Sequence, residues 1–134
     1  MIQTCNKLKI FLIEDAASIR AILIDVLQQT GMIDVIGHAE AQVDALQQLR
    51  ALEWDVAIVD ISLREGNGLG VLAGLQGDAR NYGQRVVFTA SPSAELTTRS
   101  LALGACQLFD KASDMDQMVS FIRGVQDARP SANG

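Results

Sequence analysis

The chain alternates between two hydrophobic patterns. Short, largely apolar runs bounded by polar residues are typical of strands buried on both faces. Segments in which apolar residues recur every three or four positions are typical of amphipathic helices. The short runs predict strands at residues 8–13, 33–37, 54–59, 85–88 and 106–109. The helical periods predict helices over residues 19–27, 43–52, 69–75, 91–103 and 113–125.

Local signals refine some of these boundaries. Ser91 followed by Pro92 resembles a helix N-cap with proline at the first helical position. Ser113 is placed to cap the last helix. Gly66 and Gly68, in a loop rich in turn residues, are expected to serve backbone turns.

Regular alternation of strands and helices predicts an α/β fold with helices on both faces of a parallel sheet. The first, third and fourth strands are the most continuously apolar, so we expect them to be central. The second and fifth should lie at the edges. Right-handed crossovers then favour a doubly wound, flavodoxin-like sheet of five strands in the order 2-1-3-4-5. Ligands of such sheets bind at the carboxyl ends of the strands, beside the switch point between strands one and three.

Composition and charge narrow the classes of function. The 134 residues fit one domain, expected over residues 7–127, followed by a polar tail at 128–134. The net charge of −5 argues against direct binding of nucleic acid, which requires a basic surface. No apolar stretch reaches the roughly 20 residues of a membrane span, and the N-terminus lacks a signal-peptide core. Cys5 and Cys106 have no metal-like spacing, so a reducing cytoplasm is expected.

Polar side chains follow four of the predicted strands. Glu14 and Asp15 follow the first strand, Asp60 the third, Thr89 the fourth and Lys111 the fifth. Each alone has an ordinary explanation, such as a turn cap or a surface lysine. Together they converge on one end of the sheet, where three carboxylates would repel one another or recruit a cation.

The chemistry of this set fits phosphoryl transfer. Mg²⁺ is commonly held by one or two carboxylates together with waters and a phosphate. A lysine and a hydroxyl meet the charge on phosphoryl oxygens. Asp60 can serve as the nucleophile and form an acyl phosphate.

These residues resemble the receiver domain of two-component response regulators, in particular single-domain members similar to chemotaxis regulators. The resemblance spans residues 7–125 and has the right element between each pair of motifs. The matching residues are Glu14-Asp15, Asp60, Gly68, Thr89-Ala90, Gly104-Ala105 and Lys111.

The resemblance implies a role for each site residue. Asp60 corresponds to the acceptor of a phosphoryl group from a phosphohistidine. Lys111 corresponds to the lysine that pairs with the acceptor and then with the phosphoryl oxygens, and Thr89 to the switch hydroxyl. The implied Mg²⁺ ligands are Glu14, Asp15, Asp60 and the backbone carbonyl of Ser62.

The resemblance also implies partners. These are a sensor histidine kinase or phosphotransfer protein and a downstream protein at the face of the fourth helix, fifth strand and fifth helix, with a homodimer as an open alternative. Contacts with nucleic acid or a membrane are not expected. Three positions depart from the usual pattern: Arg64 and Ala112 stand where proline is common, and Leu108 replaces the switch aromatic.

Two other functions remain open at this point. A Mg²⁺-dependent phosphatase with an aspartyl nucleophile usually has a second acid two residues after that nucleophile, where this chain has Ser62. A receiver-like interaction module that takes no phosphate usually loses the acceptor or the lysine, and this chain keeps both. The leading hypothesis is therefore a phosphorylation-dependent signalling switch that catalyses only its own phosphorylation and dephosphorylation.

Overall fold

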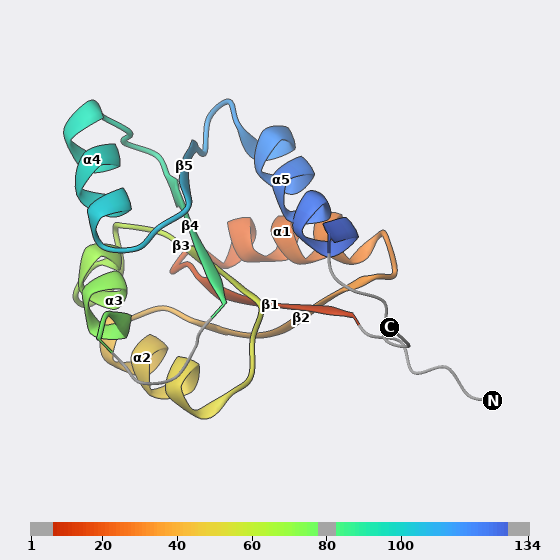
Figure 1. Cartoon of the computed structure of the whole chain (residues 1–134), viewed down its shortest axis with the longest axis horizontal. Helices are drawn as coiled ribbons and strands as arrows, with labels where there is room; N and C mark the ends of the chain where they lie inside the picture. The colour runs from red at the N-terminus through yellow and green to blue at the C-terminus, as the bar shows by residue number, and fades with distance from the viewer. Residues whose placement is uncertain (1–6, 78–82, 129–134) are drawn as a thin grey trace.

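A computed structural model of the chain describes residues 7–77 and 83–128 (Figure 1). The strands are β1 (Leu8–Ile13), β2 (Ile33–Ala39), β3 (Val56–Val59), β4 (Gln84–Thr89) and β5 (Gln107–Asp110). The helices are α1 (Ala17–Gln28), α2 (Gln42–Ala51), α3 (Gly68–Leu75), α4 (Ala94–Ala102) and α5 (Met115–Ala128).

The strands form a parallel sheet in the order β2-β1-β3-β4-β5, which confirms the predicted topology and both edge strands. Ile13, the last residue of β1, is level with Ala39 of β2 and Val59 of β3. The carboxyl ends of these three strands therefore meet at one edge of the sheet.

Two hydrophobic cores lie on opposite faces of the sheet. Successive residues of β1 alternate between them, because successive side chains of a strand point to opposite faces. Leu12 belongs to the core that contains Leu23 of α1 and Met118 of α5, whereas Phe11 belongs to the core that contains Leu49 of α2. Figure 1 shows the same division, with α1 and α5 on one side of the sheet and α2 and α3 on the other.

Two predicted helix starts are wrong. Helix α4 begins at Ala94, and the hydroxyl of Ser93 accepts a hydrogen bond from the Leu96 N–H at 3.0 Å. Ser91 instead donates its N–H to Thr89 Oγ1 at 3.2 Å, which holds Ser91 in the loop after β4. Helix α5 begins at Met115, so the residue before it is Asp114 rather than Ser113.

Other boundaries shift by a few residues. Strand β2 continues two residues beyond the predicted end, and β3 begins at Val56, after Trp54. Helix α5 includes Ala128, the first residue of the predicted tail, and residues 129–134 lie outside the described part. Among the described helices, none has the length and hydropathy that a bilayer crossing needs.

Candidate functional site

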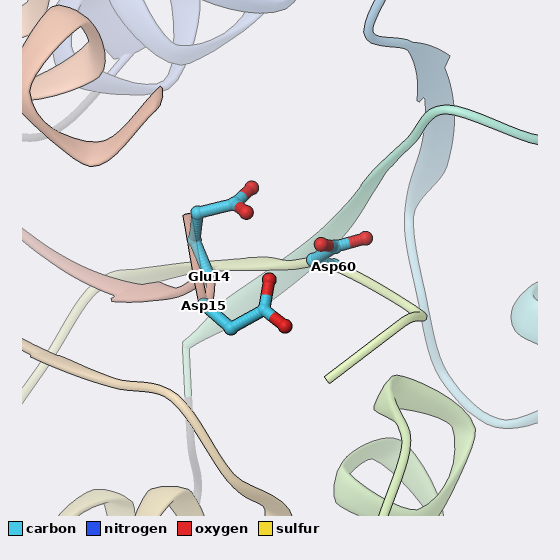
Figure 2. A group of neighbouring side chains, drawn as sticks. All are labelled: Glu14, Asp15 and Asp60. Atoms are coloured by element: carbon cyan, nitrogen blue, oxygen red, sulfur yellow. The ribbon is translucent and has the colours of Figure 1, made fainter. Parts of the chain in front are cut away.

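Three acidic side chains meet where β1 and β3 end. One carboxylate oxygen each from Glu14, Asp15 and Asp60 lies within 4.8 Å of the others. Figure 2 shows Glu14 and Asp15 projecting from the end of β1 beside Asp60 at the end of β3. The Asp60 N–H donates to the Ile13 carbonyl at 2.9 Å, so the backbone itself sets this approach. The convergence predicted from the sequence is confirmed for these three residues.

Lys111 reaches into this acidic group from the loop after β5. Its Nζ lies 2.7 Å from Glu14 Oε1 and 2.9 Å from Asp60 Oδ2, and its side chain is only 17% exposed. The backbone N–H of Lys111 donates to the Thr89 carbonyl at 2.9 Å. The end of β4 therefore holds the segment from which the lysine extends.

The electrostatics of the site reflect burial of like charges. Burial raises the pKa of the Glu14 carboxyl, and the charge of Asp60 adds to this, although the bond from Lys111 opposes it. Burial lowers the pKa of Lys111, but its hydrogen bonds to Glu14 and Asp60 outweigh burial, so the net shift is upward. Lys111 therefore carries a positive charge at neutral pH. It is one cation beside a group of three acidic side chains.

Asp60 is 4% exposed, and its two oxygens face different partners. Oδ2 accepts from Lys111, and Oδ1 accepts from the Ser62 N–H at 3.3 Å. Ser62 forms a β-bridge with Asn67, whose side chain caps α3 by accepting from the Gly70 N–H at 2.9 Å. The loop after β3 is therefore folded back on itself directly beside the acidic group.

The two glycines of this loop have different reasons to be glycine. Gly66 has φ +75°, a left-handed turn that favours glycine, as the sequence predicted. Gly68 lies at the first position of α3 and has no positive φ. A Cβ there would lie 2.3 Å from the Asp60 carbonyl oxygen, so close packing rather than a turn requires glycine.

Thr89 is buried at the end of β4, on the same edge of the sheet. Its Oγ1 accepts the Ser91 N–H, so the threonine is joined to Lys111 through its carbonyl rather than through its hydroxyl. The structure thus brings Glu14, Asp15, Asp60 and Lys111 into one cluster, with Ser62 attached to it through Asp60.

Leu108 and Phe109 of β5 point to opposite faces of the sheet, as the alternation of strand side chains predicts. Leu108 packs against the core around Phe11, whereas Phe109 belongs to the core around Leu12. The Phe109 ring is tilted 56° against Phe121, with the centroids 6.0 Å apart. An open groove of about 680 Å³ lies between α4, β5 and α5, and its lining includes Leu101, Leu108 and Phe121.

Arg20, which contacts the backbone of the acidic group at the end of β1, was not identified from the sequence. Nη1 of Arg20, on α1, donates to the Glu14 carbonyl oxygen at 2.7 Å and lies 3.1 Å from Glu40 Oε2. No motif marks Arg20, because one arginine on an amphipathic helix is an ordinary surface residue. Only the folded chain brings it to the end of β1.

A doubly wound parallel sheet with an acidic group and a lysine at its carboxyl edge is the arrangement that the resemblance to receiver domains predicted. A family model described as the response regulator receiver domain matches residues 10–123. The chain belongs to this family, which confirms the resemblance found in the sequence.

Relatives in sequence carry the same domain within longer chains. A protein-glutamate methylesterase/protein-glutamine glutaminase of Myxococcus xanthus is 32% identical over 79% of this chain, but the match covers 30% of that relative. A similar protein of Vibrio vulnificus is 31% identical over 81% of this chain and 31% of its own length. The chain thus spans about a third of the length of these relatives.

Solved structures share the fold. The response regulator domain of Thermotoga maritima CheB has a TM-score of 0.80 at 19% identity, covering 92% of this chain and 99% of that one. The receiver domain of NarL from Mycobacterium tuberculosis has a TM-score of 0.81 at 21% identity, with the same coverage of both chains. At these identities the likeness concerns the fold.

Proposed function

We propose that this receiver domain is a phosphorylation-dependent signalling switch that accepts a phosphoryl group on Asp60 from the phosphohistidine of a sensor kinase or phosphotransfer protein. One observation carries the proposal. Lys111 Nζ lies 2.9 Å from Asp60 Oδ2 inside a group of three carboxylates at the carboxyl edge of the sheet. A carboxylate can attack phosphorus as a nucleophile. The adjacent ammonium group can then stabilise the negative charge on the phosphoryl oxygens by hydrogen bonding to them.

The donor set also fits Mg²⁺. Mg²⁺ prefers oxygen ligands, and the mutual approach of Glu14, Asp15 and Asp60 within 4.8 Å supports a shared cation. Burial, and then the nearby charge of Asp60, raise the pKa of the Glu14 carboxyl, and a bound cation would oppose both effects by favouring the ionised form. Asp15, Asp60 and the Ser62 carbonyl would hold the ion, with Glu14 acting directly or through water. When bound, Mg²⁺ would supply charge neutralisation for the transferred phosphoryl group.

Asp60, Lys111 and Thr89 would each have a separate role in the phosphoryl transfer. Asp60 supplies the attacking oxygen: its new O–P bond forms as the P–N bond of the phosphohistidine breaks. Lys111, already 2.9 Å from Asp60 Oδ2, remains beside the transferred group and bonds its oxygens. Thr89 would then exchange its bond from the Ser91 N–H for one from its own hydroxyl to a phosphoryl oxygen.

The output proposed here is contact with another protein across the groove between α4, β5 and α5. This region lies next to Thr89 and Lys111 through the β4–β5 pairing, in which Thr89 is opposite Asp110. Leu108 forms part of the groove in place of an aromatic side chain. We also propose that the domain acts in the cytoplasm and that the receiver unit ends near residue 127. Methylesterase activity is not proposed, because the match to those relatives covers only their receiver part.

Intact-mass measurement tests the acceptor directly. With acetyl phosphate and Mg²⁺, the wild type should gain one phosphoryl group and Asp60→Asn none. Asp55→Asn is a matched control, because Asp55 lies just before β3 and Asp60 just after it. We expect this control to be modified like the wild type. Equal modification of Asp60→Asn would disprove the assignment.

A further inference from the structure

Arg20 joins two strand exits behind the acidic group. Its side chain is 12% exposed, and Nη1 contacts both the Glu14 carbonyl oxygen at 2.7 Å and Glu40 Oε2 at 3.1 Å. Glu14 follows β1 and Glu40 follows β2. The guanidinium therefore ties the backbone of the segment that contains Glu14 and Asp15 to the start of the next loop.

Glu40 continues the connection to the loop after β3. Its Oε1 lies 3.5 Å from Arg64 Nε, and its backbone carbonyl accepts the Arg64 N–H at 3.1 Å. A proline at position 64 could not make the second contact, since proline has no backbone N–H. Arg64, like Gly66, lies in the loop between β3 and α3, so the connection ends in the loop that follows Asp60.

One end of this connection lies in the acidic group, and the other lies in the loop that follows Asp60. One end is the Glu14 carbonyl, on the residue that itself carries a cluster carboxylate. The other end is Arg64, two residues from Ser62 and four from Asp60. Arg20, Glu40 and Arg64 thus link the end of β1 to the loop after β3 on the β2 side, whereas Lys111 bonds Glu14 and Asp60 directly.

We propose that Arg20 is a positioning residue for the divalent-cation site: through Glu40 and Arg64 it fixes the Glu14-Asp15 segment relative to the Asp60–Ser62 loop, so that both can bind one Mg²⁺ ion. This inference rests on the Mg²⁺ site of the proposed function. Arg20 touches no carboxylate of the cluster in the described contacts; it acts on the backbone and on Glu40.

The positive charge of Arg20 and its positioning role predict opposite effects on Mg²⁺ affinity. A guanidinium near a cation site repels the cation, so through electrostatics alone its removal would tighten Mg²⁺ binding. Loss of positioning has the opposite effect, because residues that orient metal ligands typically contribute about 10–100-fold to metal affinity. The sign of the change in affinity therefore separates the two roles.

Calorimetric titration of the whole chain with Mg²⁺ measures this sign. Arg20→Met keeps an unbranched apolar stem and removes the guanidinium, and we expect it to weaken Mg²⁺ binding about tenfold. Glu40→Gln should also weaken binding. The double variant should be little weaker than Arg20→Met alone, because both residues act through one connection. Arg123→Met, on an exposed part of α5, controls for the loss of one positive charge and should bind like the wild type.

The outcomes are distinct. If the wild type binds no Mg²⁺, the proposed function fails. If the wild type binds Mg²⁺ and folded Arg20→Met binds it equally or more tightly, only the positioning role is overturned. If Arg20→Met does not fold, Arg20→Lys keeps the charge without the planar fork of donors and should bind several-fold more weakly. Wild-type affinity in Arg20→Lys would then overturn the inference.

Discussion

Gly68 offers a direct test of how closely Asp60 is packed against α3. In Gly68→Ala the added Cβ would lie 2.3 Å from the Asp60 carbonyl oxygen and 2.9 Å from Ile61 Cα and Val59 Cγ1. The first two of these atoms belong to the backbone at the end of β3. They cannot rotate away as a flexible side chain would, so either α3 or the loop after β3 must move.

The size of the effect follows from these contacts. Overpacking a close-packed site typically costs about 1–3 kcal/mol, and a backbone obstacle places Gly68→Ala near the upper end. Alanine gains up to about 1 kcal/mol over glycine within a helix. We therefore expect Gly68→Ala to lose about 2 kcal/mol of the free energy of unfolding. A displacement of Asp60 by about 1 Å would also slow phosphoryl uptake, by up to about 100-fold.

Urea unfolding and intact-mass kinetics with acetyl phosphate measure both effects. Gly124→Ala is the matched control: it lies within α5, and a Cβ there has no neighbour within 4 Å. That control should be as stable as the wild type or up to about 1 kcal/mol more stable, with normal phosphoryl uptake. A Gly68→Ala protein with wild-type stability and wild-type uptake would refute the packing argument.

Three further predictions concern the same edge of the sheet. Because folding raises the pKa of Glu14 above its ordinary value of 4.5, Glu14 stabilises the fold most below that pH and loses this contribution as the pH rises through the folded value. Without Mg²⁺, Glu14→Gln should therefore melt at a higher temperature than the wild type at neutral pH, and the gap should narrow towards pH 4.5; a constant gap would contradict this. Asn67→Ala removes the cap of α3 and should cost about 1 kcal/mol in urea unfolding, whereas an unchanged midpoint would deny the cap a role. Lys111→Ala should still bind Mg²⁺ by calorimetry but pass its signal poorly in a kinase-coupled assay, and normal signalling would remove Lys111 from the mechanism.

Much of the site could be predicted because it consists of residues at strand ends. Apolar runs specify buried strands, and alternation with helices makes the sheet parallel, so the ends of the strands share one edge. That logic placed Glu14, Asp15 and Asp60 together, and the structure confirms it. It also oriented Leu108 and Phe109 correctly, since successive strand residues face opposite sides.

Helix starts were harder, because several residues near one another could act as the cap. Ser91 and Pro92 carry a strong local signal for a helix start, yet Ser93 is the cap of α4. The deciding interaction is the bond from the Ser91 N–H to Thr89 Oγ1, which keeps Ser91 with the end of β4. A choice between such neighbours depends on where the preceding strand ends in space.

The sequence by itself determined the order of the strands, the edge at which the acidic group forms and the residue types gathered there, because hydrophobic periodicity and strand polarity are local properties of the chain. Only the tertiary structure decided which contacts surround those residues. Arg20 reaches the Glu14 carbonyl, and Gly68 packs against the Asp60 carbonyl, through approaches between segments far apart in the chain or across a folded loop. Such approaches leave no periodic pattern, since each depends on the separation of two backbones rather than on either segment alone.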